Sequence, residues 1–151
     1  MVTVKDLMRN EVYSIHANTN VRDLLNLFVE KQITGAPVVK ENNELVGIIT
    51  DADVLGEIYD PPSLIDVMTY VAAFDTEALF LEEIHALLEK PVIDLMTKKV
   101  ITVTEDTRLS KVAQIFSKRK FKKIPVVSEQ KIIGVVSRGD VVRYLVQKFI
   151  L

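Results

Sequence analysis

The chain of 151 residues is 48% apolar and 26% charged, which is typical of one compact globular domain and argues against a disordered chain. Its 19 basic and 21 acidic residues give a net charge of −2. The protein as a whole therefore lacks the positive charge that would attract nucleic acid or an anionic membrane. The absence of cysteine excludes disulfides, zinc–thiolate sites and a cysteine nucleophile.

The N-terminal stretch MVTVKDLMRNEV mixes polar and apolar residues and lacks the apolar core of a signal peptide. No apolar run reaches the roughly 18 residues that a membrane span needs. We therefore expect a cytoplasmic protein without membrane insertion.

The chain contains an internal repeat, which begins with the run Val-x-Asp-Leu-Met. This run occupies residues 4–8 and recurs 88 residues later, at residues 92–96. Beyond a one-residue deletion in a predicted turn the spacing becomes 87, which aligns residues 47–53 with residues 134–140. The aligned stretches, GIITDAD and GVVSRGD, both have the pattern Gly-apolar-apolar-Thr/Ser-x-x-Asp.

Each copy begins with a predicted strand and helix. The strands are expected at residues 11–15 and 99–103, and the helices after an N-cap at Thr19 or Asn20 and at Thr107. Apolar residues then recur at helical spacing and predict one buried stripe in each helix. These stripes are Val21, Leu24, Leu25 and Phe28 in the first copy, and Leu109, Val112, Ala113 and Phe116 in the second.

Two further strands and a second helix complete each copy. Residues 36–40 and 45–50 predict a hairpin, as do the runs IPVVS and IIGVVS of the second copy. The second helices are expected near residues 52–58 and 139–149. The fold class is thus α/β (α+β): two β-α-β-β-α repeats, at residues 4–58 and 92–151, which pack as a pseudo-twofold pair within one module over residues 1–151.

A helical insertion is predicted between the repeats, at residues 59–91. Ser63 and Asp66 fit a helix start, residues 64–71 form an apolar run, and residues 76–90 have the pattern of an amphipathic helix that ends before Pro91. Such an insertion is longer than a connector needs. Core cover and dimerisation are the favoured explanations, and a surface for an effector protein is the third.

Thr50 and Asp53 end the first repeated signature, and Ser137 and Asp140 end the second. A carboxylate accepts two hydrogen bonds, so each Asp could hold the vicinal hydroxyls of a ribose, while the hydroxyl and the amides of a helix start could bind a sugar or phosphate oxygen. The same spacing is also that of a capping box, which stabilises a helix start without any ligand. From these residues alone the two interpretations have about equal support.

These motifs together resemble a tandem pair of CBS domains, the regulatory module named after cystathionine β-synthase. The resemblance covers about residues 4–58 and 92–149 and rests on the Asp-Leu-Met runs, the Pro-Val-Val strands and the signatures that end in Asp53 and Asp140. It implies a non-catalytic module that binds adenosyl compounds in clefts between the repeats. AMP, ADP, ATP, S-adenosylmethionine and cyclic di-adenylate are ligands of the family, and AMP or ATP is favoured here.

The resemblance also implies further contacts with a ligand. Ala36 with Pro37, and Ile124 with Pro125, are expected to offer backbone and an apolar wall to adenine, although a proline can also simply begin an edge strand. Ser14 and Thr102 match positions that sometimes line the cleft, where a hydroxyl is more often structural.

The two copies differ in charge before their prolines. Lys122 and Lys123 precede Ile124, whereas uncharged Thr34 and Gly35 hold the equivalent places. Family resemblance implies that the two lysines reach the phosphate of a nucleotide whose ribose is held by Asp53, and Arg138 could add to either site. The remaining basic residues of 118–123 are typical of a solvated helix end.

We therefore expect a sensor that binds an adenosyl ligand, needs no cofactor, forms a homodimer and signals to an unknown effector protein. The alternative is an interaction or dimerisation module that binds no nucleotide, in which both Asp residues are only caps. Neither histidine has the spacing of a metal site, and no nucleophile elbow or Gly-rich phosphate loop is present.

Overall fold

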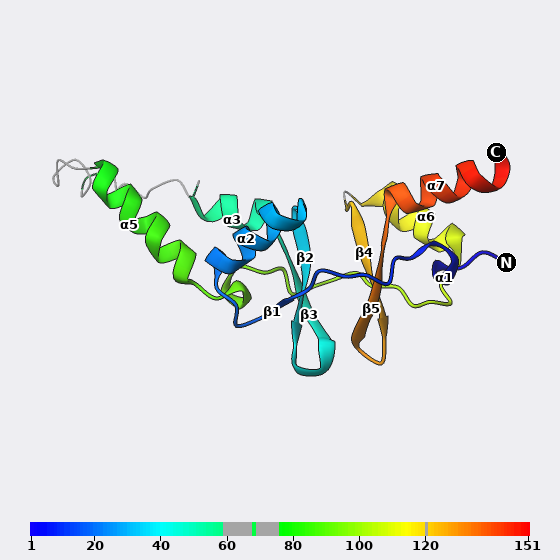
Figure 1. Cartoon of the computed structure of the whole chain (residues 1–151), viewed down its shortest axis with the longest axis horizontal. Helices are drawn as coiled ribbons and strands as arrows, with labels where there is room; N and C mark the ends of the chain where they lie inside the picture. The colour runs from blue at the N-terminus through cyan, green and yellow to red at the C-terminus, as the bar shows by residue number, and fades with distance from the viewer. Residues whose placement is uncertain (59–67, 69–75, 120) are drawn as a thin grey trace. The chain divides into compact units, whose positions relative to one another are not determined.

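A computed structural model of the chain describes residues 1–58, 68, 76–119 and 121–151 (Figure 1). The predicted helix start at Ser63 and the apolar run around it lie outside these residues, Met68 excepted. None of the described helices has the length and apolarity needed to cross a membrane. The main helices and strands are α1 (Val4–Leu7), β1 (Ile15–His16), α2 (Val21–Lys31), β2 (Gly35–Lys40), β3 (Glu44–Thr50), α3 (Asp51–Ile58), α5 (Thr76–Glu89), α6 (Leu109–Lys118), β4 (Lys123–Ser128), β5 (Lys131–Ser137) and α7 (Arg138–Phe149).

The predicted fold class and its repetition are confirmed. Helix, hairpin and helix follow one another as α2, β2, β3 and α3 in the first copy and as α6, β4, β5 and α7 in the second. The first hairpin turns through a short 3-10 helix, Glu41–Asn43, and the second through Glu129 and Gln130 alone. The one-residue deletion inferred from the sequence therefore lies in this turn.

The first strand of each copy is shorter than predicted. In the first copy only Ile15–His16 forms a strand, and in the second Val103 makes a single bridge to Val126. The strands pair in the order β1-β2-β3-β5-β4, and the antiparallel pair of β3 and β5 meets at Glu44 and Lys131. Pro37 thus lies in an interior strand, β2, so the edge-strand explanation does not account for it.

Three details of the predicted helices need correction or refinement. Asn20, one of the two predicted N-caps of α2, accepts a bond from the backbone N–H of Asp23 at 2.9 Å. Thr107 does not cap α6, because its hydroxyl accepts a bond from the backbone N–H of Thr104 and the helix begins one residue later than predicted. Ala113 is exposed and so lies outside the buried stripe of α6.

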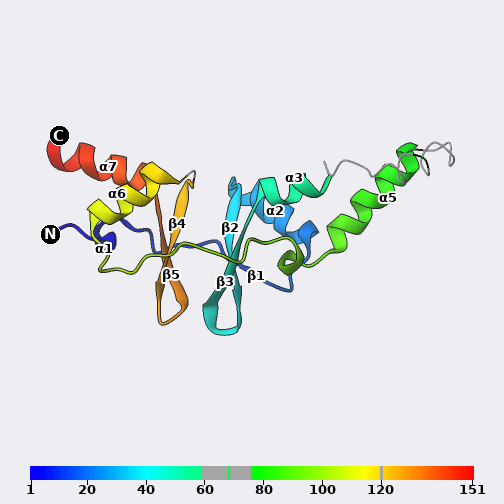
Figure 2. The ribbon, with the colours of Figure 1, turned by 180° about the vertical axis from the view of Figure 1, so that it is seen from behind.

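The chain divides into two compact units that do not coincide with the sequence repeats. The first consists of residues 1–14, 39–46 and 99–151, and the second of residues 15–38 and 47–98. In both views α6 and α7 lie beside the hairpin of β4 and β5, and α2 and α3 lie beside β2 and β3 (Figures 1 and 2).

The first unit contains the N-terminal segment of the first repeat, residues 1–14, which we call the N-terminal arm. The backbone N–H of Val4 donates to the carbonyl of Thr107 at 2.8 Å, and Arg9 and Val135 exchange two backbone bonds of 2.9 and 3.0 Å. The apolar side chains of α1 are buried in the core of the second repeat, so the arm completes that core. This core is formed by Val4, Leu7, Val103, Val112, Phe116, Ile124, Val126 and Val136.

The second unit contains the matching segment of the second repeat, residues 92–98, which we call the second arm. The backbone N–H of Val92 donates to the carbonyl of Thr19 at 2.7 Å, and Ile48 and Thr97 exchange bonds of 2.9 and 2.8 Å. Val92 is fully buried. Each Asp-Leu-Met run therefore packs on the other repeat, which sequence similarity between the copies could not reveal.

The described helix of the insertion, α5, packs on α2 and α3 of the second unit. Leu87 is buried, and Glu89 forms an exposed ion pair with Arg22 at 2.8 Å. The other end of α5 leaves Phe80 and Leu81 about half exposed. The C-terminal half of the helix therefore serves as core cover, one of the explanations expected for the insertion.

Candidate functional site

The two signature carboxylates lie at equivalent helix starts. In each unit a strand ends at the Thr or Ser and the following helix begins at once, at Asp51 after β3 and at Arg138 after β5. The backbone N–H of Thr50 donates to Oδ2 of Asp53 at 2.9 Å, and the N–H of Ser137 donates to Oδ2 of Asp140 at 2.8 Å. One oxygen of each carboxylate therefore stabilises its helix start, as the capping interpretation requires.

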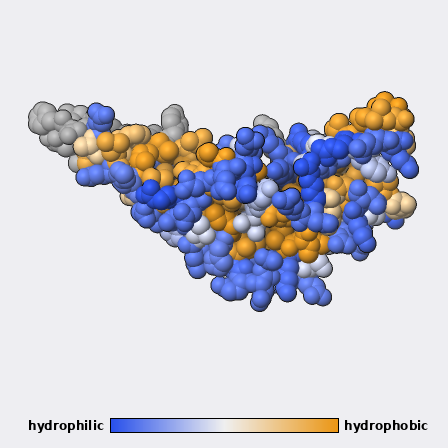
Figure 3. Space-filling model, viewed as in Figure 1, coloured by the Kyte–Doolittle hydropathy of each residue, from blue (hydrophilic) through white to orange (hydrophobic). Residues whose placement is uncertain are grey.

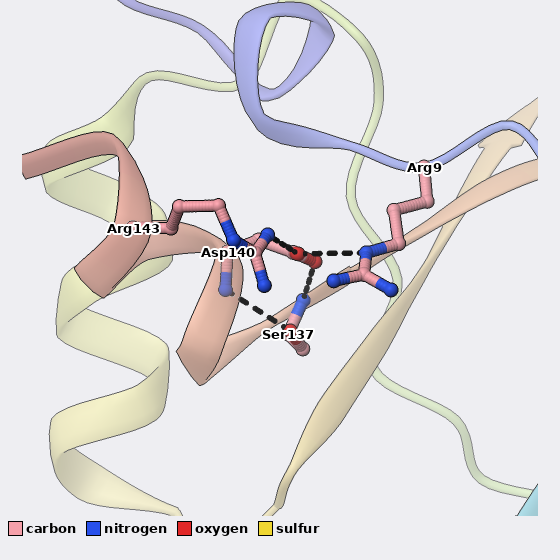
Figure 4. Close-up of polar contacts among 4 residues, drawn as sticks. All are labelled: Arg9, Ser137, Asp140 and Arg143. Atoms are coloured by element: carbon pink, nitrogen blue, oxygen red, sulfur yellow. Dashed lines mark hydrogen bonds and ion pairs between the residues drawn. The ribbon is translucent and has the colours of Figure 1, made fainter. Parts of the chain in front are cut away.

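The second oxygen of Asp140 binds two arginines. Oδ1 accepts from Nε of Arg9 and from Nη1 of Arg143, both at 2.9 Å, and the Ser137 hydroxyl accepts from the Asp140 backbone N–H at 3.1 Å. Figure 4 shows Arg9 from the N-terminal arm and Arg143 from α7 converging on this carboxylate. The Asp140 side chain is only 1% exposed. Both of its oxygens are engaged by the chain itself.

The hydrogen bonds to Asp140 also lower its pKa. Burial alone would raise the pKa of the carboxyl, but hydrogen bonds from Ser137, Arg143 and Arg9 hold the pKa below its usual range. The carboxylate is therefore ionised and paired at neutral pH.

This pairing predicts a pH-dependent contribution of Asp140 to stability. Because its pKa in the folded state is lowered, the contribution is complete above the unfolded value of about 3.9 and is lost as the pH falls through the folded value. We expect Asp140→Asn to lower the free energy of unfolding by about 1–2 kcal/mol at pH 7, discounted because both arginines are half exposed. Urea unfolding of both proteins between pH 7 and pH 3 measures this difference.

The difference between wild type and Asp140→Asn should stay constant down to about pH 5 and shrink below about pH 4. Asp53→Asn is the matched control, since it changes the same signature position, which forms no ion pair with any described residue. A difference between wild type and Asp140→Asn that persists undiminished at pH 3 would show that the ion pairs do not stabilise the fold.

Asp53 differs from Asp140 in its second oxygen. Oδ2 of Asp53 accepts from the backbone N–H and, at 3.3 Å, from the hydroxyl of Thr50, but Oδ1 has no partner among the described residues. The positions equivalent to the two arginines are Thr97 and Gly56, which carry no charge. Asp53 is half-buried rather than buried. Of the two signature carboxylates, Asp53 alone has an oxygen without a partner among the described residues.

Arg9 and Arg143 were not identified from the sequence. Arg143 lies three residues after Asp140 on one helix, a spacing that allows contact and could have indicated the pair. Arg9 is 131 residues away from Asp140, and its partner depends on the exchange of arms.

The other predicted site residues belong to one unit or the other. Ala36 is buried and Pro37 half-buried in β2, while Ile124 and Pro125 are fully buried in β4, with Pro125 facing Val135 across the hairpin. Lys122 and Lys123 are exposed. Ser14 is half-buried just before β1, and Thr102 is exposed beside the bridge at Val103.

Arg138 was predicted to add to a ligand site, but its guanidinium binds backbone carbonyls. Nε donates to Phe121 at 2.7 Å, and Nη2 donates to Arg119 at 2.7 Å and to Phe116 at 3.1 Å. The guanidinium carbon also lies 5.9 Å from the centre of the Phe116 ring. Among the described residues, no group of three or more metal-binding side chains is arranged to hold a metal ion.

Comparison with known proteins identifies the family of this repeated site. A model of the CBS domain matches residues 4–60 and again residues 92–147. The chain belongs to the CBS domain family. It is a tandem CBS pair, and the signatures that end in Asp53 and Asp140 occupy the same place in its two CBS repeats.

Related CBS proteins cover nearly the whole chain. MJ1426 of Methanocaldococcus jannaschii is 30% identical over 97% of this chain and 92% of its own length. CBSX2, a chloroplastic CBS domain-containing protein of Arabidopsis thaliana, is 35% identical over 96% of this chain. The match covers 64% of CBSX2, so the chain spans less than two thirds of that relative.

Solved structures of CBS pairs share the fold. The crystal structure of CBSX2 in complex with AMP matches with a TM-score of 0.73 and 35% identity, over 97% of this chain and 98% of that one. The CBS pair of MJ0100, in complex with 5′-methylthioadenosine and S-adenosylmethionine, matches with a TM-score of 0.67 and 25% identity over 98% of each chain. Related CBS pairs thus bind adenosyl compounds.

Proposed function

We propose that this CBS pair is a non-catalytic regulatory module that binds one adenosyl ligand per chain, with Asp53 as the ribose anchor. The observation that carries the proposal is the contrast between the two signature carboxylates. Oδ1 of Asp53 is open among the described residues, whereas Oδ1 of Asp140 accepts bonds from Arg9 and Arg143. A carboxylate with a free oxygen can accept bonds from the hydroxyls of a ribose, and one that is already paired must first lose its partners.

The nature of the ligand follows from the relatives and from local charge. Adenosyl compounds are bound by the CBS pairs of CBSX2 and MJ0100, which supports the same class of ligand here. AMP or ATP is favoured because Lys122 and Lys123 provide two exposed cations suited to phosphate. The lysines belong to the first unit and Asp53 to the second.

Asp140 has a different role in this proposal. Its ion pairs hold the N-terminal arm, through Arg9, to the start of α7. The sequence interpretation gave Asp140 a ligand site like that of Asp53, and the paired geometry supports a structural role for it. A ligand that binds one conformation of the CBS pair more tightly than another would raise the population of that conformation. An effector protein that recognises the favoured conformation would then receive the signal.

The alternative function is ligand-independent dimerisation, and the surface of α7 favours it. Val142, Leu145 and Phe149 are 60%, 41% and 72% exposed and lie at helical spacing. Figure 3 shows apolar atoms gathered at the C-terminal end of the chain. Such a surface could be covered by a second copy of the chain.

A thermal-shift experiment at two protein concentrations separates these functions. A ligand that binds only the folded state raises the Tm, so AMP or ATP at 100 times its Kd should stabilise the protein by about 2.7 kcal/mol. GTP is the matched control for the base. A Tm that no adenosyl compound changes, but that rises with protein concentration, would overturn the proposal and support dimerisation.

A further inference from the structure

The ends of the two equivalent helices α2 and α6 are closed in different ways. After α2 the cap residue Gln32 has a left-handed conformation, with φ 54°, and its N–H donates to the carbonyls of Phe28 and Val29. Ile33 then donates to Phe28 at 3.0 Å. Backbone N–H groups that follow the helix thus bind the carbonyls of Phe28 and Val29 near its end.

After α6 the chain does not turn in this way. The cap residue Arg119 is extended, with φ −121°, so carbonyls near the helix end need donors from elsewhere. The guanidinium of Arg138 supplies them, to Phe116, Arg119 and Phe121. A cation at the C-terminal end of a helix is also favoured by the helix dipole. One side chain thus replaces the backbone closure of the first copy.

The segment that Arg138 binds leads directly into the two lysines. The backbone N–H of Arg138 donates to the carbonyl of Lys122 at 3.2 Å, and Lys123 pairs with Ser137 in the β4–β5 ladder. The backbone of the second signature therefore holds Lys122 and Lys123, and the side chain of Arg138 holds the carbonyl of Phe121 just before them. Their own side chains remain exposed.

The first copy has no equivalent of the Arg138 side chain or of the two lysines. The residue equivalent to Arg138 is Asp51, whose backbone N–H donates to Thr34 at 2.9 Å and whose carboxylate accepts from the N–H of Ala52 at 2.8 Å. A carboxylate cannot donate to the helix carbonyls. Arginine and the lysine pair therefore occur together in one copy and are both absent from the other.

We infer that Arg138 is a positioning residue, which holds the backbone of Arg119 and of residues 121–123 so that the two lysines can bind the phosphate of the ligand. The inference rests on the proposed function. It differs from a direct contact of Arg138 with phosphate, because Nε and Nη2 already donate to three backbone carbonyls. Lysine cannot reproduce this fork of donors, although it keeps the positive charge.

The test compares adenosine with AMP and ATP in calorimetric titrations of wild type, Arg138→Gln and Arg138→Lys. Adenosine lacks phosphate, so its affinity should stay within about threefold of the wild-type value. The affinity for AMP and ATP should fall about tenfold in both variants, the effect of losing one charge-assisted hydrogen bond. Recovery of AMP binding by Arg138→Lys would overturn the inference and indicate a direct charge contact.

A double-mutant cycle adds a second readout. The variant Lys122→Ala/Lys123→Ala should lose the same preference for AMP over adenosine, and adding Arg138→Gln should reduce it no further. Additive losses would contradict action through the lysines.

Hydrogen exchange should be faster in Arg138→Gln than in wild type at residues 119 and 121–123, and unchanged in α2. Equal exchange in wild type and Arg138→Gln would overturn the positioning role whatever the ligand. A wild type that binds none of the three compounds would overturn the proposed function, and the phosphate role of Arg138 with it.

Discussion

Alanine at Gly134 is expected to destabilise the folded protein by about 1–3 kcal/mol, the usual effect of inserting a methyl group where no space exists. A Cβ at this position would lie 2.8 Å from the carbonyl oxygen of Arg9 and 3.1 Å from Cε of Met8. The Met8 side chain can move, but the Arg9 carbonyl is held by its backbone bond to Val135 at 3.0 Å. The N-terminal arm must therefore shift away from β5.

Gly47 provides the same test in the second unit. A Cβ there would lie 2.7 Å from the sulfur of Met96 and 2.8 Å from the carbonyl oxygen of Thr97. That carbonyl accepts the backbone bond from Ile48, so Gly47→Ala should displace the second arm and destabilise by a similar amount.

Gly56→Ala is the control for both substitutions. A Cβ at Gly56 would have no neighbour within 4 Å among the described residues, and Gly56 lies inside α3, so alanine should stabilise by about 0.5–1 kcal/mol. Urea unfolding measures all three variants, and a lower midpoint with an unchanged slope would report lost stability. Equal midpoints for Gly56→Ala and Gly134→Ala would refute the close packing of the arm.

These glycines explain why two separate sequence motifs recur together. The Asp-Leu-Met run and the glycine of the signature are distant in each copy, and the sequence gives no sign that they touch. In the structure Gly134 packs closely against the backbone carbonyl of Arg9, the residue after Met8. Gly47 packs in the same way against the carbonyl of Thr97, the residue after Met96. The repeat could be aligned from the sequence, but an alignment between copies says nothing about which copy each arm packs on.

Most of the helices and both hairpins could be predicted because their signals are local. The apolar stripe of α2 and the turns of the hairpins depend on neighbours within a few residues. The arginines of Asp140 illustrate what could not be predicted, since Arg9 reaches it from the opposite end of the chain. Arg138 was expected at a ligand because its charge was visible, whereas the carbonyls that it binds depend on how α6 ends.

The asymmetry between the two signatures has a simple origin in charge. The two repeats place their signature carboxylates at the same position of the fold. Asp140 binds Arg143 and Arg9. The residues equivalent to these arginines are Gly56 and Thr97, which carry no charge. These two differences between the copies accompany an Oδ1 of Asp53 that has no partner within the part of the chain that the structure describes. The capping interpretation thus applies to both copies, whereas the proposed ligand role applies to Asp53 alone.

Asp53→Asn is expected to weaken AMP binding about tenfold or more. The amide oxygen of asparagine can still accept the N–H of Thr50, so the helix start is preserved. Its amide nitrogen can only donate, however, and cannot accept the hydroxyls of a ribose, which removes charge-assisted bonds worth about 1.5–3 kcal/mol each. Asp140→Asn should leave AMP binding within about threefold, although it lowers the stability of the fold.

Calorimetric titration of wild type, Asp53→Asn and Asp140→Asn with AMP at neutral pH determines which signature carboxylate anchors the ligand. Circular dichroism at the same temperature first establishes that each variant is folded. We expect one AMP per chain for the wild type and for Asp140→Asn, with binding weakened about tenfold or more only in Asp53→Asn. Two equivalent sites per chain, or a loss of AMP binding in Asp140→Asn alone, would contradict it.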